Sequence, residues 1–142
     1  MRHGLPVALC PLLLLVVTVS AQSPRTVWDG VYSDAQAKRG RELYNSKCLS
    51  CHGADLSGGE MAPPLVGGDF GSDWNGLSLG DLFDRIRISM PQNAPGSLSG
   101  QQNADILAFV LQANKFPSGK TELAKDAMML KGIQYQTQKP GH

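Results

Sequence analysis

Two cysteines, Cys48 and Cys51, stand three positions apart, and His52 directly follows the second of them. This C-x-x-C-H spacing is the attachment signature of a c-type haem. On one turn of helix the two sulfurs can reach the two vinyl groups of a single porphyrin, and the next side chain is aimed at its iron. We therefore expect one covalently attached haem c, with thioethers to Cys48 and Cys51 and with His52 as the proximal iron ligand.

The C-x-x-C part alone has two other interpretations. A zinc site needs two further ligands, but the third cysteine of the chain, Cys10, lies in the leader segment considered below. A redox dithiol of the thioredoxin kind is expected after a strand in a βαβ unit. Here the cysteines follow a helical pattern and precede glycines and prolines, so the haem interpretation is favoured over both alternatives.

The sixth iron ligand decides which chemistry a bound haem supports. Met90 is favoured, because Pro91 restricts its backbone to an extended conformation and ends the preceding helix, so that the thioether can turn inward from a fixed loop. Met61 is interpreted as a loop packing residue. The remaining candidates lie in a segment with little ordering signal and are Met128, Met129 and His142.

The start of the chain has the pattern of an export signal. A short polar beginning is followed by an apolar run from Leu5 to Val19, and Val19-Ser20-Ala21 offers small residues for cleavage. Pro11 interrupts the run, which is too short to span a bilayer and has no basic stop after it. We expect residues 1–21 to be a signal peptide, the mature protein to be periplasmic in a bacterium, and no stable membrane insertion to remain.

Charge and size limit the kinds of partner and the number of domains that the chain can have. The chain has 13 Lys and Arg against 12 Asp and Glu, and loss of the leader removes Arg2, so the mature charges balance and nucleic acid is excluded as a partner. About 120 mature residues form one domain. With both mature cysteines committed to the porphyrin, the cofactor takes the stabilising place that disulfides have in other small exported proteins.

Three helices are expected, and no strand alternation is evident. The first runs from Ser33, which with Gln36 fits a capping box, to about Ser46, and Gly40 allows a second helix to approach its apolar face closely. From Gly53 to Gly76 the chain is rich in Gly, Pro and Asp and is predicted to be a long loop around the cofactor.

The second helix begins after Ser78, with Asp81 at its third position, and has an apolar stripe. The third opens at Ser99, is apolar over most of its circumference and ends at Asn114. The apolar stripe of the second helix, mentioned above, consists of Leu79, Leu82, Phe83 and Ile86. These boundaries predict a lead-in at 22–32, a haem domain at 33–119 and a C-terminal tail at 120–142.

With these residues in view, the chain resembles the class I cytochromes c, in particular the small periplasmic cytochrome domains associated with quinoprotein alcohol dehydrogenases. The resemblance covers about Ser33 to Gly119. The motifs that carry it are Cys48-Leu49-Ser50-Cys51-His52-Gly53, Ala62-Pro63-Pro64-Leu65-Val66-Gly67, and Met90-Pro91 followed by Ala94-Pro95-Gly96. It implies a mostly α fold in which three main helices and long loops wrap around one covalently bound haem.

The resemblance also implies roles for single residues. Met90 would be the distal ligand, and the carbonyl of Pro63 would accept a hydrogen bond from Nδ1 of His52. Leu65 would line the cofactor site. Trp74 matches a position that can reach a haem propionate, although a loop tryptophan that covers the core is an equal alternative. The tail after Gly119 lies outside the resemblance, and the sequence does not choose between disorder and docking on a partner.

Iron held by both His52 and Met90 has no open position for a substrate. The expected function is therefore single-electron transfer between periplasmic redox partners, such as a dehydrogenase or a terminal oxidase, and the chain is not expected to be an enzyme. One alternative is a haem sensor or peroxidase-like protein with an open or displaceable distal position. Another is a fixed cytochrome subunit of a larger dehydrogenase.

Overall fold

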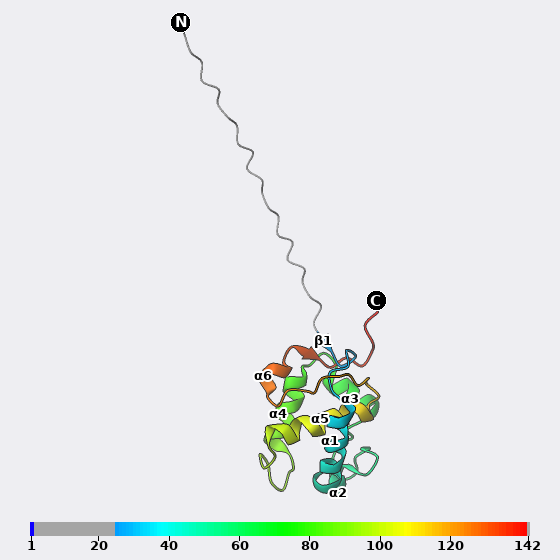
Figure 1. Ribbon diagram of the computed structural model, residues 1–142. Coiled ribbons are helices and arrows are strands. Elements are labelled where there is room, and N and C mark those ends of the chain that lie inside the picture. The colour runs from blue at the N-terminus through cyan, green and yellow to red at the C-terminus, as the bar shows by residue number, and fades with distance from the viewer. Residues whose placement is uncertain (2–24, 142) are drawn as a thin grey trace.

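The computed structural model describes Met1 and residues 25–141. The predicted signal peptide lies outside these residues apart from Met1, and so does the candidate ligand His142. The described body is mostly helical, as predicted, and two short strands pair in parallel (Figure 1). The elements are β1 (Arg25–Thr26), α1 (Asp34–Lys47), α2 (Leu49–His52), α3 (Gly67–Trp74), α4 (Leu79–Ser89), α5 (Gly100–Ala113), α6 (Ala127–Leu130) and β2 (Ile133–Gln134).

Helices α1 and α5 cross at a glycine. A Cβ on Gly40 would overlap the carbonyl oxygen of Asp105 and would lie 3.0 Å from Cβ of Phe109. The two backbones thus approach as closely as a missing side chain allows, which confirms the predicted close packing. Ala37 and Tyr44 lie on the same face of α1 and are buried.

The N-terminus of α1 differs in one detail from the prediction. The hydroxyl of Ser33 accepts a hydrogen bond from the backbone N–H of Gln36 at 3.1 Å, as expected. The reciprocal half of the capping box is not formed, because the Gln36 side chain is buried and bonds to the C-terminal segment instead. Its Nε2 donates to the carbonyl of Leu123 at 3.2 Å, and the N–H of Leu123 donates to its Oε1 at 2.8 Å.

The other two expected helices begin at the predicted caps. Ser78 and Asp81 form a complete capping box on α4, and the hydrogen bonds from Ser78 lower the pKa of the Asp81 carboxyl. Helix α5 begins after Ser99, where Gln102 completes a second capping box. The predicted stripe of α4 is buried, except that Ile86 is half-buried against the core.

The predicted long loop is wrong over its second half, where α3 forms. The composition of this segment disfavours a helix, since three of the eight residues are glycine. Burial overrides this preference, because Phe70 packs against Trp74 one helical turn later and against Tyr135 from the C-terminal segment. The ring centroids are 6.2 Å and 5.9 Å apart. The first part of the segment, from 53 to 66, contains no helix, as predicted.

Residues after Gly119 belong to the folded body. The strand β2 in this segment pairs with β1, and the Tyr135 ring lies 5.1 Å from that of Phe116. Four of its side chains are in the core: Leu123, Leu130, Ile133 and Tyr135. The lead-in contributes buried Val27, Val31 and Tyr32 in the same way. Both flanks of the predicted haem domain therefore complete its hydrophobic core.

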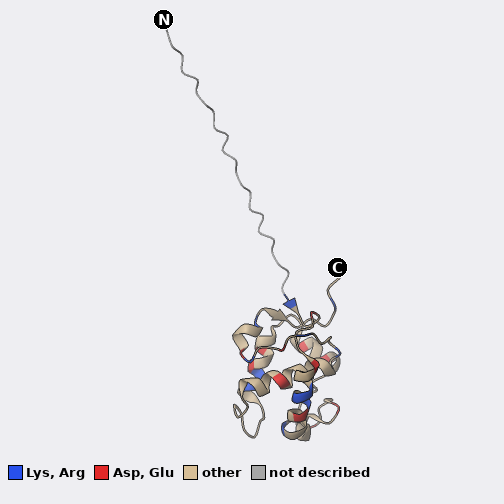
Figure 2. Ribbon diagram, viewed as in Figure 1, with Lys and Arg blue, Asp and Glu red and all other residues tan. Residues whose placement is uncertain are grey.

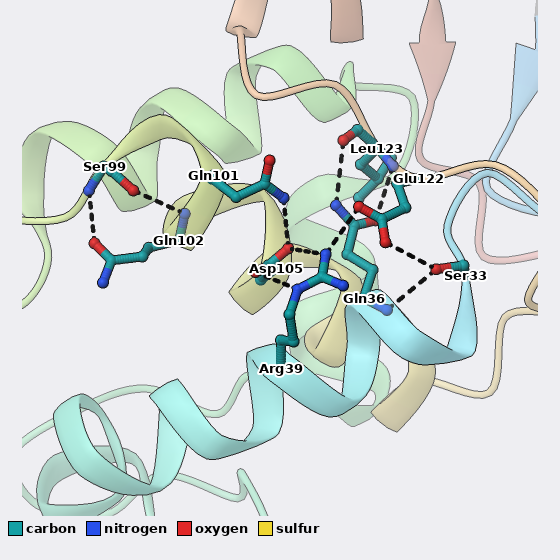
Figure 3. A network of polar contacts seen from close by, with 9 residues as sticks. All are labelled: Ser33, Gln36, Arg39, Ser99, Gln101, Gln102, Asp105, Glu122 and Leu123. Atoms are coloured by element: carbon teal, nitrogen blue, oxygen red, sulfur yellow. Dashed lines mark hydrogen bonds and ion pairs between the residues drawn. The ribbon is translucent and has the colours of Figure 1, made fainter.

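A polar network fastens the C-terminal segment to the crossing of α1 and α5 (Figure 3). Arg39 on α1 donates from Nε and Nη2 to the two carboxylate oxygens of Asp105, both at 3.0 Å. Its Nη2 also donates to Glu122 at 2.8 Å. Asp105 accepts a further hydrogen bond from Gln101 at 2.8 Å. These bonds raise the pKa of Arg39, the bond to Asp105 most of all.

Substitution of Arg39 by glutamine is expected to lower the free energy of unfolding by about 2 kcal/mol. The reason is that the side chain of Asp105 is only 5% exposed and would lose its charged partner. Guanidinium-induced unfolding followed by circular dichroism measures this loss. Arg87→Gln is the matched control, because the Arg87–Asp84 pair is exposed and is expected to contribute at most about 0.5 kcal/mol. Equal effects of the two variants would contradict the assignment.

Candidate haem site

The C-x-x-C-H residues occupy a single helical turn. Cys48 ends α1 and also begins α2, and its carbonyl accepts the N–H groups of Cys51 and His52 at 3.1 Å and 3.0 Å. The side chain of Cys48 is half-buried, Cys51 is exposed and His52 is 7% exposed. Both cysteines are unpaired. The structure therefore presents two thiols and one imidazole on one turn, the spacing that the sequence predicted.

The orientation of the His52 ring is set by the following loop. Its Nδ1 lies 3.0 Å from the carbonyl oxygen of Pro63, the partner that the family resemblance implied. A carbonyl oxygen can only accept, so this contact places the ring proton on Nδ1. The other nitrogen, Nε2, then keeps its lone pair and is the atom available to a metal.

Backbone hydrogen bonds hold Pro63 in place. The N–H of Gly58 donates to the carbonyl of His52 at 2.9 Å, and the N–H of Leu65 donates to the carbonyl of Leu56 at 2.8 Å. Gly58 has φ of +74°, and a Cβ there would lie 2.5 Å from the carbonyl oxygen of Ala62, so the tight loop requires glycine. The loop from 53 to 65 is thus closed on itself around His52.

Two residues that the sequence analysis did not single out for the site join this loop to the helices. Tyr44 is buried on α1 against Phe109, and its hydroxyl donates to the carbonyl of Gly53 at 2.7 Å. Burial raises the pKa of Tyr44 to about 12, so the hydroxyl remains a donor at neutral pH. Asn114, at the end of α5, donates through Nδ2 to the carbonyl of Leu65 at 2.9 Å. No local pattern marks either residue, because each bonds to a distant backbone group.

The electrostatics of the thiols bear on the alternative interpretations. Burial, reinforced by the neighbouring Cys51, raises the pKa of the Cys48 thiol to about 11. A thiol with such a pKa is a poor attacking group in a redox dithiol. Within residues 25–141, no three His, Cys, Asp or Glu side chains gather as a metal-binding group.

Met90, the predicted distal ligand, lies at the end of α4. It caps the C-terminus of α4 with an extended backbone, φ −123° and ψ 151°, and its N–H still donates to the carbonyl of Ile86 at 2.9 Å. Met90 is half-buried. The other methionines within residues 25–141 are largely exposed: Met61 76%, Met128 72% and Met129 73%. Of these four methionines, Met90 is therefore the least exposed.

The remaining predicted site residues are Leu65 and Trp74. Both are half-buried and pack against the hydrophobic core. Trp74 stands at the end of α3 beside Phe70. Among the described residues its indole N–H has no hydrogen-bond acceptor, so the group remains available to another partner.

This donor set fits a haem c. Two unpaired thiols share one turn with an imidazole whose Nε2 is available, and a bulky thioether lies on a separate loop. The helical fold and this site together define a cytochrome c domain. The chain belongs to the family described as "Cytochrome C oxidase, cbb3-type, subunit III", which matches residues 35–110, more than half of its length. The cofactor of such a domain is covalently attached haem c with its iron, and the domain is an electron-transfer module.

Two curated relatives carry the names of redox proteins. The chain is 37% identical over 92 residues to a thiosulfate dehydrogenase of Allochromatium vinosum. The matched region covers 58% of this chain and 31% of the relative. It is 28% identical over 96 residues to a cytochrome bc1 complex cytochrome c subunit of Corynebacterium efficiens, covering 64% of this chain and 30% of the relative. The chain therefore spans about a third of the length of these relatives.

A solved structure shows the same fold. The crystal structure of the sulfane dehydrogenase SoxCD from Paracoccus pantotrophus matches with a TM-score of 0.57 and 23% sequence identity, over 85% of this chain and 68% of that one. The names of these three proteins do not single out the alcohol dehydrogenase cytochromes that the sequence resemblance suggested. Within residues 25–141, the helices are all too short or too polar to traverse a bilayer.

Proposed function

We propose that the chain is a mono-haem carrier of single electrons, with thioethers to Cys48 and Cys51 and axial ligation by His52 and Met90. The observation that carries this proposal is the contact of His52 Nδ1 with the carbonyl of Pro63 at 3.0 Å. It fixes the ring tautomer and leaves Nε2 for the iron, on the same helical turn as both thiols. Bound haem would supply the one-electron chemistry by cycling its iron between the ferrous and ferric states.

Each protein group in this site has a part in tuning that chemistry. Two protein ligands would fill both axial positions and so exclude a substrate from the metal. A thioether from Met90 favours the ferrous state and raises the reduction potential. The carbonyl of Pro63 increases the donor strength of His52 through the Nδ1 hydrogen bond and holds its ring in one orientation.

The proposed setting is the bacterial periplasm. Residues 1–21 would direct export, and the mature chain would form one unit, since both the lead-in and the tail pack on the region from 33 to 119. The proposed partners are a dehydrogenase, of which an alcohol dehydrogenase is one candidate, or a terminal oxidase. The name of one curated relative supports a dehydrogenase as partner, and the name of the other supports a place in a redox complex. Gel filtration of native extract separates a free carrier, which elutes near its own mass, from a fixed subunit.

Replacement of Met90 by alanine tests the distal ligand. The reduced wild-type protein is expected to refuse carbon monoxide, and Met90→Ala is expected to bind it because one axial position opens. Its reduction potential is expected to fall by a few tenths of a volt, within the range of about 0.8 V that axial ligands span. Absorption spectra under carbon monoxide and a redox titration measure the two effects.

Met61→Ala is the matched control, since Met61 is 76% exposed and should change neither property. If Met90→Ala leaves both properties unchanged, the ligand assignment is wrong. Rapid carbon monoxide binding by the wild-type protein would instead support the sensor or peroxidase-like alternative.

A further inference from the structure

A cavity of about 330 Å³ lies on the side of α1 and α5 where they meet the loop after His52. Its lining includes Arg41 and Asn45 from α1, Ala54 from the loop, Phe109 and Gln112 from α5, and Lys115. None of the residues that we propose to hold the haem lines this cavity. The proposed electron-transfer function therefore leaves it without a role.

The lining of the cavity has an uncompensated positive charge. Two of its residues, Arg41 and Lys115, are cationic, two carry amides, and none is acidic. Within the part of the chain that the structure describes, neither cation forms an ion pair. The nearest recorded link to a carboxylate is indirect, through Gln112, whose Nε2 donates to Asp34 at 3.4 Å. Figure 2 shows both basic and acidic ribbon segments along α1, whose acidic residues do not line the cavity.

The guanidinium of Arg41 is held in a defined orientation. Its central carbon lies 5.3 Å from the centroid of the Phe109 ring, a cation–π distance. Its Nη2 donates to Oε1 of Gln112 at 3.4 Å. Stacking on one face leaves the planar fork of the guanidinium available to a carboxylate, which it can bind through two parallel hydrogen bonds.

Lys115 occupies a backbone position at which glycine is usual. It follows the C-cap Asn114 with φ of +67°, its N–H donates to the carbonyl of Gln112 at 3.0 Å, and the next N–H, of Phe116, donates to Leu111 at 3.2 Å. This arrangement ends α5 in a left-handed turn, which costs a side chain about 1 kcal/mol relative to glycine. Asn114 fixes the turn further by bonding to the carbonyls of Val110 and Leu65. The base of the lysine side chain is therefore rigidly placed at the rim of the cavity.

We propose that this cavity binds a small dicarboxylate. Its volume is at the lower end of the range for small-molecule sites, about 300–1,000 Å³. Arg41 binds one carboxylate and Lys115 the other, while the amide of Asn45 supplies a further hydrogen-bond donor. The ring of Phe109 and the methyl group of Ala113 contact the short apolar chain between the two charges. A concave site with two cations on its lining fits such a molecule better than it fits the flatter surface of a partner protein.

Titration of the reduced, full-length mature protein with succinate tests this proposal, with backbone amide NMR shifts as the readout and sodium chloride of equal ionic strength as the reference. Saturable shifts are expected at Asn45, Ala54 and Lys115. Lys115→Gln and Arg41→Gln are each expected to weaken binding by about tenfold or more, since each removes a charged hydrogen-bond donor. Lys115→Gly should do the same while relieving the turn, so its loss of binding cannot be attributed to misfolding.

Lys38→Gln is the matched control, because Lys38 is an exposed cation on α1 that does not line the cavity. It should leave the affinity unchanged. The proposal is overturned if the shifts do not saturate, if sodium chloride reproduces them, or if Lys115→Gln and Lys115→Gly bind succinate as the wild type does.

Discussion

Simultaneous replacement of Cys48 and Cys51 by alanine is expected to abolish covalent haem retention completely. The two thiols are the only cysteines of the proposed mature chain, so no other sulfur can replace them. The structure leaves both thiols unpaired on one helical turn beside His52. Denaturation of wild-type protein should leave the haem absorption with the chain, whereas the double variant should release all of it.

The single variants make this test more specific. Cys51→Ala removes an exposed side chain and should leave one thioether, with weaker retention. Cys48→Ala also removes a half-buried side chain that packs against the core, so it should lower stability as well. Ser50→Ala lies between the two cysteines and is exposed, and it should retain haem as the wild type does. Mass spectrometry of the denatured chains measures attachment directly. Full retention in the double variant would show that the attachment chemistry is wrong.

Replacement of Gly40 by alanine is expected to lower the free energy of unfolding by about 3 kcal/mol or more. The new Cβ would overlap the carbonyl oxygen of Asp105 and lie 2.5 Å from its carbonyl carbon. These are backbone atoms of α5, which cannot rotate away as a side chain can, so the two helices must separate. The intrinsic preference of a helix for alanine, about 1 kcal/mol over glycine, recovers only part of this loss.

Gly68→Ala is the matched control for this prediction. Gly68 is also helical, in α3, but a Cβ there would meet no atom within 4 Å. Alanine at this position is expected to be neutral or to stabilise by up to about 1 kcal/mol. Guanidinium unfolding of the two variants, followed by circular dichroism, gives the comparison. Equal stability of both variants would show that α1 and α5 do not cross at Gly40.

Local sequence patterns were sufficient to predict the structure wherever it depends on residues that are close together in the chain. The caps at Ser33, Ser78 and Ser99 placed the starts of three helices, because a capping side chain bonds to backbone only a few residues away. The C-x-x-C-H spacing predicted the cofactor for the same reason, since one turn of helix brings the three side chains of the motif together. The extended backbone of Met90 before Pro91 is likewise a local steric effect.

Only the tertiary structure decided the features that depend on distant partners. The position of Gln36 fits a capping box in the sequence, but its side chain bonds to Leu123, 87 positions away. The reason is that a buried amide needs hydrogen-bond partners for both its nitrogen and its oxygen. Helix α3 forms in a glycine-rich segment because Phe70 is buried against Tyr135. The anchors of the proximal loop, Tyr44 and Asn114, act through backbone groups that no periodicity can mark. Residue spacing thus determined the cofactor and the helix starts, whereas long-range contacts determined how the loop after His52 and the C-terminal segment pack on the helices.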